Sequence, residues 1–188
     1  MSGYYNNPEL TLETIKDGWL HSGDIAQFNS DGTVSIIDRS KDIFKLAQGE
    51  YVAPEYLQII YERHPLIQQI FVYGDPSRSA LVAVVVPDPE TFTKWARWIA
   101  SDSNAGIHGL CSNVHVTDAL LNSLDEFGRE RKLQGFELIR ALYCEMTPFD
   151  ISSNCLLSNT LKLKRSVATQ YYRVTIDDMY RQLETLHS

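Results

Sequence analysis

GWLHSGDIAQFNSDGTVSIIDRSKDIFKLAQGEYVAP, residues 18–54, is the stretch of sequence that constrains the fold most strongly. Its first half alternates apolar and polar residues imperfectly around the turn dipeptide Asp31-Gly32, which predicts a β-hairpin. Its second half predicts a smaller hairpin around Gln48-Gly49, followed by a helix whose first turn accommodates Pro54. We therefore expect two hairpins in direct succession, with a helix after the second.

The same stretch carries four charged side chains that suit a polyhydroxylated, anionic ligand such as a nucleotide: Asp24, Arg39, Lys41 and Lys45. A carboxylate accepts hydrogen bonds from vicinal hydroxyls, whereas Arg and Lys donate to oxygens. The alternative is a solvated surface cluster, in which each exposed ion pair contributes only ~0–1 kcal/mol. The spacing of the charges alone favours this alternative.

Working outward, the C-terminal part of the chain predicts an α+β fold, a small mixed sheet with packed helices. The predicted elements are a helix after Pro54 that ends at His64-Pro65, strands at 69–73 and 81–86, a helix at 92–99, a helix capped by Thr117, a strand at 137–145 and a final helix at 164–186. Residues 1–40 are too few to bury a core alone. We expect them to be a β-hairpin segment left from a larger N-terminal domain, with residues 41–188 forming a separate unit.

Residues 101–116 are polar and contain glycine, which predicts a mobile surface loop. This segment includes the string HxxCxxxH, formed by His108, Cys111 and His115. A zinc site needs a fourth ligand and a supporting second shell, so we predict a loop and no metal site. The aromatic residues Trp19, Tyr51, Trp95 and Trp98 are expected to be packing residues.

Composition excludes several classes of protein. The 188 residues carry a formal net charge of −7, which argues against broad attraction to nucleic acid or to an anionic membrane. No apolar run approaches the ~18–20 residues that span a bilayer, and the N-terminus does not have the pattern of a signal peptide. Three cysteines favour reduced thiols in a protein that faces the cytosol, which predicts a soluble chain.

A second informative string is SNTLKLKRSVATQYY, residues 158–172, which places Lys162 just before the final predicted helix. The ordinary interpretation is a basic helix start whose Lys164 and Arg165 are solvated. Cations at a helix N-terminus are mildly unfavourable, so such a cluster calls for a functional reason.

Both strings resemble signature segments of the adenylate-forming enzymes, the superfamily of acyl-CoA synthetases, luciferases and peptide-synthetase adenylation domains. The forms GEYVAP after KDIFKLAQ, and KLKR in the second string, are most similar to the long-chain fatty acyl-CoA synthetases. The resemblance implies that residues 1–40 end the large adenylation domain and that residues 41–188 are the mobile C-terminal domain.

The resemblance also implies the reaction of the parent enzyme, in which a fatty acid, ATP and CoA become acyl-CoA, AMP and pyrophosphate through an acyl-adenylate. Substrates would be ATP with Mg²⁺, CoA and a long-chain fatty acid, with no metal bound to this chain and no nucleic acid partner. The partner of the chain would be the absent N-terminal domain of the same polypeptide. The parent would be cytoplasmic or at the cytosolic face of a membrane, which is compatible with peripheral membrane association.

By the same resemblance, Lys162 is the lysine that reaches into the active site during adenylation. The family often has an aromatic residue where Leu161 stands and a proline-containing pair in place of Ser158-Asn159, so Lys164 stays open as the alternative. The physical case for this lysine is that an ammonium group offsets the charge of two anions brought together at the α-phosphate.

The remaining roles implied by the resemblance fall in the first string. Asp24 would accept both ribose hydroxyls, and Arg39 would contact the same ribose or the phosphates. Lys41 falls at the hinge about which the small domain swings. The loop that faces CoA would contain Lys45, Gly49 and Glu50.

The phosphate loop, the adenine-binding segment and a fatty-acid tunnel are missing from these residues, so we expect the chain to be inactive alone. Two alternatives stay open. One is another adenylate-forming ligase, acting on an aryl or amino acid. The other is a stand-alone, non-catalytic interaction module, which the acidic composition and the polar segment at 101–116 would allow.

Overall fold

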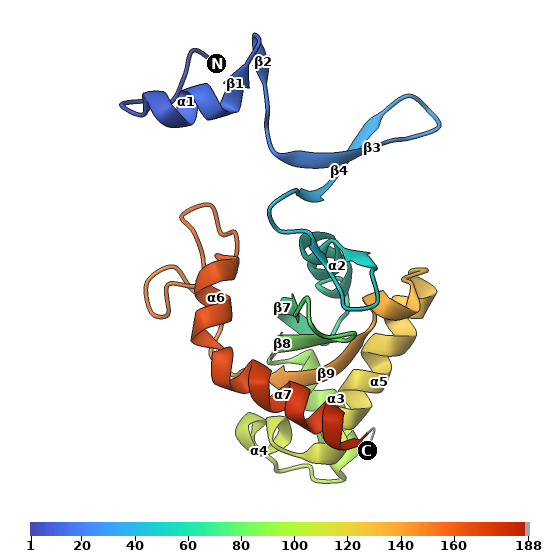
Figure 1. The fold of residues 1–188 in the computed structure, drawn as a ribbon. Coiled ribbons are helices and arrows are strands. Elements are labelled where there is room, and N and C mark those ends of the chain that lie inside the picture. The colour runs from blue at the N-terminus through green and yellow to red at the C-terminus, as the bar shows by residue number, and fades with distance from the viewer. Residues whose placement is uncertain (187–188) are drawn as a thin grey trace.

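The structure is a computed structural model that describes residues 1–186 and has two parts of unequal size (Figure 1). An N-terminal segment projects from a larger body and contains α1 (Pro8–Thr14), β1 (Ile15–Lys16), β2 (Trp19–Leu20), β3 (Asp24–Phe28) and β4 (Val34–Arg39). The body begins with β5 (Phe44–Lys45), β6 (Tyr51–Val52), α2 (Pro54–Tyr61), β7 (Ile67–Gly74) and β8 (Leu81–Pro87). It continues with α3 (Thr91–Ala100), α4 (Ile107–Cys111), α5 (Val114–Glu130), a 3₁₀ turn (Gly135–Glu137), β9 (Ile139–Cys144), α6 (Arg165–Tyr171) and α7 (Arg173–Leu186).

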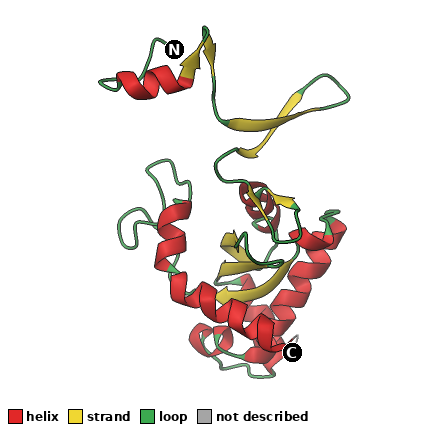
Figure 2. Ribbon diagram, viewed as in Figure 1, coloured by secondary structure: helices red, strands yellow, loops and turns green. Residues whose placement is uncertain are grey.

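The body is organised around a three-stranded mixed sheet of order β7-β8-β9. β7 and β8 form an antiparallel pair, and β9 runs parallel to β8 after the crossover through α3, α4 and α5. Helices cover both faces of the sheet (Figure 2). The mixed sheet with packed helices therefore agrees with the fold class predicted from sequence.

The central strand β8 is buried along its whole length because each of its faces belongs to a different core. One face, with Ala83 and Val85, packs in the core that contains residues of α2 through α5. The other face, with Val82 and Val84, packs with residues of α6 and α7. Successive strand residues point to opposite faces, so a continuous apolar run from 81 to 87 is what a strand covered on both sides requires.

In the N-terminal segment, no residue of α1 is buried, and the large apolar side chains are exposed. Trp19 is 76% exposed and Phe28 is 83% exposed. The hairpin of β3 and β4 forms as predicted, with a bulge between Ile25 and Ala26. The exposed apolar side chains accord with the expectation that this segment cannot bury a core of its own.

The prediction of a loop at 101–116 is wrong for residues 107–116, which contain α4 and the start of α5, whereas residues 101–106 belong to no helix or strand. Leu110, Cys111 and Val116 are buried in the core next to α3, and this packing outweighs the polar composition. The cap of α5 is Asn113, whose side chain accepts from the backbone N–H of His115 at 2.9 Å. Thr117 lies inside the helix and is not its cap.

The predicted final helix from 164 to 186 is two helices, because Tyr172 leaves helical geometry at φ −97° and ψ 16°. The Tyr172 ring is buried between Phe71 and Phe149, with ring centroids 6.5 and 6.1 Å away. The prediction of packing roles also fails for Trp19, Tyr51 and Trp98, which are all exposed, whereas Trp95 packs on Phe92.

Candidate functional site

Asp24 and Arg39 face one another across the hairpin of β3 and β4, where they are register partners. Nε of Arg39 lies 2.9 Å from Oδ1 of Asp24, and Nη1 of Arg39 donates to the carbonyl of Ser22 at 3.1 Å. The Asp24 side chain is 26% exposed, and that of Arg39 is 54% exposed. The pair is therefore accessible to a ligand, with the carboxylate fixed by the guanidinium beside it.

The chain leaves β4 through a tight turn that joins the two parts of the molecule. The carbonyl of Arg39 accepts from the N–H of Asp42 at 3.0 Å and from that of Ile43 at 3.1 Å. Lys41 lies exposed in the middle of this turn. A change in the backbone angles of these few residues would reorient the body relative to the hairpin.

Lys162 lies at the base of a second tight turn, formed by residues 158–161, just before α6. Leu157 and Leu163 form an antiparallel bridge, and within it the N–H of Ser158 donates to the carbonyl of Lys162 at 2.8 Å. Leu161 adopts a φ of +60°, in the left-handed region, which closes the turn. The ammonium of Lys162 reaches across to α2, where Nζ lies 3.5 Å from Oε1 of Glu55.

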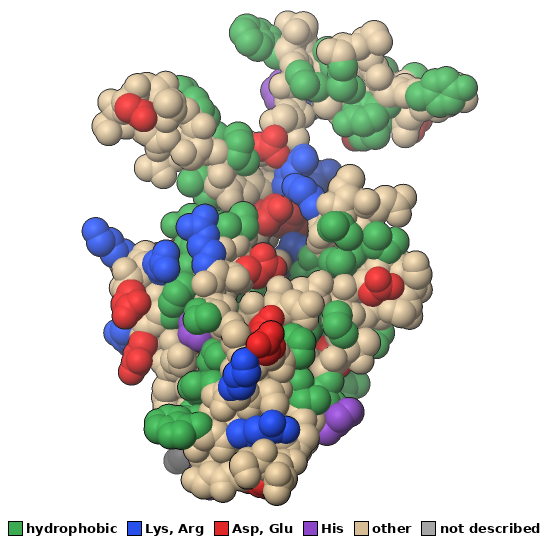
Figure 3. Space-filling view, turned by 180° about the vertical axis from the view of Figure 1, so that it is seen from behind, with side chains coloured by type: hydrophobic (Ala, Val, Ile, Leu, Met, Phe, Trp, Pro, Cys, Tyr) green, Lys and Arg blue, Asp and Glu red, His purple; other side chains and the backbone are tan. Residues whose placement is uncertain are grey.

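A cleft of about 340 Å³ lies between the end of β4, α2 and the turn that carries Lys162. It is lined by Arg39, Asp42, Glu55, Gln58, Ile59, Glu62, Gln69, Ile70, Phe149, Leu157, Leu161, Lys162, Leu163 and Arg165. Figure 3 shows acidic and basic side chains gathered at the narrow junction between the N-terminal segment and the body. The cleft thus brings together Lys162 and Arg39, which are 123 positions apart in the sequence.

A second hollow on the other side of Arg39 is lined by residues of the hairpin, the turn and α1, including Ser22, Gly23, Lys41 and Asp42. Arg39 lines both hollows, whereas Asp24 lines neither of them. Arg39 therefore lies between the part of the molecule that holds Asp24 and the part that holds Lys162.

The turn that carries Lys162 is fastened to the body by Arg165. Its Nη2 donates to the carbonyl of Val72 at 2.6 Å, its Nη1 donates to Oε1 of Gln58, and its guanidinium lies 5.3 Å from the centre of the Phe71 ring. Burial lowers the pKa of Arg165, although the nearby carboxylates, that of Asp42 first, oppose this shift. The guanidinium stays charged because an Arg is not deprotonated in proteins.

A second fastening uses Gln69 of β7, whose side-chain amide pairs with the backbone of Phe149. Nε2 donates to the Phe149 carbonyl at 3.1 Å, and Oε1 accepts from the Phe149 N–H at 2.7 Å. The segment from 147 to 164 has no helix or long strand, so these side-chain contacts fix its course.

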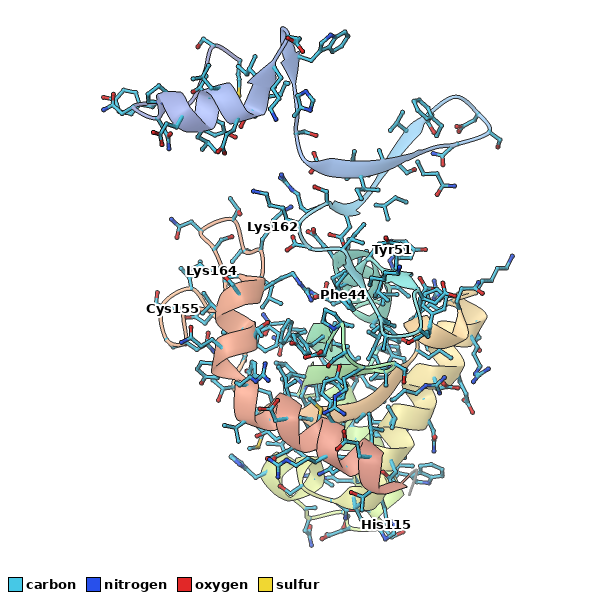
Figure 4. All side chains as sticks on the ribbon, viewed as in Figure 1. Phe44, Tyr51, His115, Cys155, Lys162 and Lys164 are labelled. Atoms are coloured by element: carbon cyan, nitrogen blue, oxygen red, sulfur yellow. The ribbon has the colours of Figure 1, made fainter. Side chains whose placement is uncertain are left out.

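Lys164, the alternative active-site lysine, is the N-cap residue of α6 and is exposed. Its N–H donates to the carbonyl of Leu156 at 2.8 Å, and it does not line the cleft. Figure 4 shows Lys162 directed toward the junction and Lys164 beside α6, away from it. Of the two lysines, Lys162 is the one that lines the cleft.

The residues expected on the CoA side occupy the hairpin of β5 and β6. Lys45 Nζ lies 5.5 Å from the centre of the Tyr51 ring. Gly49 has a φ of +99°, and the N–H of Leu46 donates to the Glu50 carbonyl at 2.8 Å. None of Lys45, Gly49 and Glu50 lines the cleft that holds Lys162. The two groups of candidate residues therefore present separate surfaces of the body.

Sequence inspection missed Asp38, Glu55 and Arg165 as parts of the site. Asp38 is only 2% exposed, and its carboxylate accepts from the N–H of Glu55 at 2.9 Å. A signal existed for Arg165, since it ends the KLKR run. No signal linked Asp38 to Glu55, because nothing in the local pattern shows that the strand before the turn lies against the helix after it.

Within residues 1–186, no three His, Cys, Asp or Glu side chains come together as a metal site would require. Cys111 of the HxxCxxxH string is buried in the core, as is Cys144. No helix in the same residues is long and apolar enough to cross a membrane.

Comparison with known proteins identifies similar sequences over nearly the whole chain, although no family model matches it. The chain is 45% identical over 182 residues to long chain acyl-CoA synthetase 1 of Arabidopsis thaliana, covering 97% of this chain and 27% of that protein. It is 43% identical over 183 residues to long-chain-fatty-acid–CoA ligase 5 of Rattus norvegicus, covering 97% and 26% respectively. The chain thus spans about a quarter of the length of the curated relatives it matches.

Two solved structures share the fold closely. The adenylation domain of a carboxylate reductase from Mycobacterium chelonae has a TM-score of 0.79 and 34% identity, covering 95% of this chain and 26% of that one. The didomain of a carboxylic acid reductase from Segniliparus rugosus, in complex with AMP, has a TM-score of 0.79 and 36% identity, covering 98% and 24%. These similarities confirm the resemblance to the C-terminal portion of long-chain acyl-CoA synthetases and confirm the predicted fold class.

Proposed function

We propose that this chain is the C-terminal part of an AMP-forming long-chain fatty acid–CoA ligase, a member of the adenylate-forming enzymes. The observation that carries the proposal is the 45% identity over 97% of the chain to a long chain acyl-CoA synthetase. Residues 1–40 end the large adenylation domain in this proposal, and residues 41–188 form the mobile C-terminal domain.

In the first step, a carboxylate oxygen of the fatty acid attacks the α-phosphorus of ATP, and the bond to pyrophosphate breaks. Both partners are anions, so the reaction needs positive charge where they meet. Lys162 supplies an ammonium group on a braced turn, and its place in one cleft with Arg39 supports this role. Asp24 accepts the ribose hydroxyls, and Arg39 contacts the same ribose or the phosphates.

In the second step, the thiolate of CoA attacks the acyl carbonyl of the adenylate, and AMP leaves. The body turns about Lys41 between the two steps, so that the hairpin with Lys45, Gly49 and Glu50 replaces Lys162 at the reacting atoms. The separation of these residues from the cleft that holds Lys162 supports two orientations, since one orientation cannot present both surfaces. In the structure, Lys162 and Arg39 share a cleft, which is the arrangement suited to the first step.

The partners in this proposal are ATP, CoA, a long-chain fatty acid and the N-terminal domain of the same polypeptide. Mg²⁺ enters as the counter-ion of ATP, and so as part of the substrate. Three cysteines, two of them buried and none in a disulfide, support a protein of the cytosol or of the cytosolic face of a membrane. In this proposal, peripheral association with a membrane is a property of the full-length parent enzyme.

A second candidate is the adenylation domain of a carboxylic acid reductase, because two such domains have TM-scores of 0.79. Their identities of 34% and 36% are lower than the 45% to the plant synthetase. We therefore place the ligase first, ahead of the reductase and of other adenylate-forming ligases.

The test is a graft of this chain into Arabidopsis long chain acyl-CoA synthetase 1, in place of the segment to which it is 45% identical. The graft should form acyl-CoA from palmitate, ATP and CoA, whereas the synthetase without that segment, and this chain alone, should not. A folded but inactive graft, or turnover by this chain alone, would contradict the proposal.

A further inference from the structure

Asp38 is a buried carboxylate on the hairpin side of the proposed hinge, three positions before Lys41. Burial of a carboxylate is costly unless its oxygens are hydrogen-bonded. Oδ1 accepts from the N–H of Arg39 at 2.6 Å, and Oδ2 accepts from the N–H of Glu55 at 2.9 Å. One carboxylate therefore bonds to backbone on both sides of the hinge.

The bond to Glu55 caps a helix that has no cap of its own. α2 begins with Pro54, its N-cap residue is Ala53, and no side chain of the N-cap position accepts from its first turn. The free N–H groups of a helix N-terminus favour an anionic acceptor. Asp38 supplies this acceptor from β4 and lies 15 positions before Ala53.

Glu55 connects this cap to the active-site lysine. Its backbone N–H is bound to Asp38, while its side-chain carboxylate lies 3.5 Å from Nζ of Lys162. Fixing the first turn of α2 against β4 thus fixes the partner of Lys162 close to Arg39 in the shared cleft.

We propose that Asp38 is a positioning residue that selects the orientation in which Lys162 faces the nucleotide side. This inference rests on the proposed function, because it assigns the orientation to the adenylation step. Asp38 moves with the hairpin and Glu55 moves with the body, so a large rotation about Lys41 breaks the bond between them. An interaction made in only one of two orientations shifts the population toward that orientation. Adenylation therefore depends on Asp38, and formation of the thioester does not.

The first test measures orientation in this chain without any activity. Spin labels are attached to the native Cys155, which is exposed, and to Phe28→Cys at the exposed end of β3, while Cys111 and Cys144 are buried. Double electron–electron resonance spectroscopy then gives the distribution of distances between the two labels. Asp38→Ala should broaden this distribution or add a second distance. An unchanged distribution would overturn the proposal.

Asp88→Ala is the matched control. The Asp88 carboxylate also caps a helix, accepting at the start of α3 from the N–H groups of Thr91 at 2.9 Å and Glu90 at 3.1 Å, but these residues all belong to the body. Loss of this cap should cost comparable stability and leave the distance distribution of the labelled chain unchanged. A broadening equal to that of Asp38→Ala would show that lost stability, and not the contact across the hinge, changes the orientation.

The second test separates the two half-reactions in the graft described above. Asp38→Ala should reduce the rate of adenylation about tenfold, which corresponds to about 1.4 kcal/mol. The reason is that the variant loses the cap of α2 and, with it, the preference for the orientation that serves adenylation. Asp38→Asn keeps one acceptor oxygen and should lose less. Thioester formation from pre-formed acyl-adenylate should stay within about twofold of the parent graft, as expected when no contact of that step is lost. Equal losses in both half-reactions would overturn the proposal.

An inactive parent graft would count against the proposed function alone, since the spin-label comparison still decides the role of Asp38.

Discussion

Replacing Arg165 with Met should destabilise the body substantially, although the ordinary interpretation of the basic run at 162–165 is that this residue is solvated. The guanidinium donates to the Val72 carbonyl at 2.6 Å and to Gln58, and it covers the Phe71 ring at 5.3 Å. Hydrogen bonds to a charged group contribute about 1.5–3 kcal/mol each, and a partly desolvated cation–π contact contributes about 1 kcal/mol. The Met side chain keeps apolar contact with Phe71 and removes a half-buried charge, which offsets part of the loss.

We expect a net loss of about 3 kcal/mol in the free energy of unfolding, because the Val72 carbonyl and the Gln58 side chain lose their donor. The assay is urea denaturation of the chain followed by circular dichroism. With a dependence of about 2 kcal/mol per molar urea, the midpoint should fall by about 1.5 M.

Arg181→Met is the matched control for this substitution. Arg181 pairs with Asp178 on the exposed side of α7, with side chains 69% and 47% exposed. An exposed pair contributes about 0–1 kcal/mol, so the midpoint should move by less than about 0.5 M. Equal shifts for Arg165→Met and Arg181→Met would refute the view that Arg165 fastens the turn of Lys162 to the body.

Two further predictions concern the packing of the body. Gly74→Ala should lower the free energy of unfolding by about 1–3 kcal/mol in the same urea assay, because an added Cβ would overlap the Phe44 ring and lie 2.8 Å from Cδ2 of Leu81. The control is Gly135→Ala, where the space around an added Cβ is open. Equal urea midpoints for the two variants would contradict this reasoning. Burial lowers the pKa of His64 below its ordinary value of 6.5, so the unfolded chain takes up the proton first and stability should fall as the pH drops below about 6.5. His64→Gln should reduce this dependence between about pH 7.5 and 5.5, and an equal loss of stability in both proteins would exclude His64 as its source.

The sheet and the helix after Pro54 could be predicted from sequence because their signals are local. A continuous apolar run from 81 to 87 is typical of a strand covered on both faces, and Pro54 suits a first helical turn. The hairpins follow equally from Asp31-Gly32 and Gln48-Gly49. Each of these elements can therefore be predicted from its own residues, without contacts to distant parts of the chain.

The elements that were missed depend on contacts between distant residues. α4 has only five residues and one of them is Gly109, so it is too short to give a local helix signal, and packing of Leu110 and Cys111 beside α3 and α5 stabilises it. No proline or glycine marks the break at Tyr172, whose ring is buried between Phe71 and Phe149.

The candidate site shows the same division. The motifs indicated Asp24, Arg39 and Lys162, but nothing in the sequence indicated that Glu55 would lie beside Lys162. Asp38 escaped notice for the same reason, because its partner is a backbone N–H of a later helix. Side chains that act through backbone groups leave no compositional signal.

The most direct test of the central claim is the pair of half-reactions in grafts that carry Lys162→Ala or Lys164→Ala. Our account predicts that Lys162→Ala lowers adenylation by roughly 10²–10³, as loss of one such electrostatic contact does, and leaves thioester formation from pre-formed acyl-adenylate largely intact. Lys164→Ala should change neither half-reaction greatly. A greater loss of adenylation in Lys164→Ala, or equal loss of both half-reactions in Lys162→Ala, would contradict the assignment of Lys162 as the adenylation lysine.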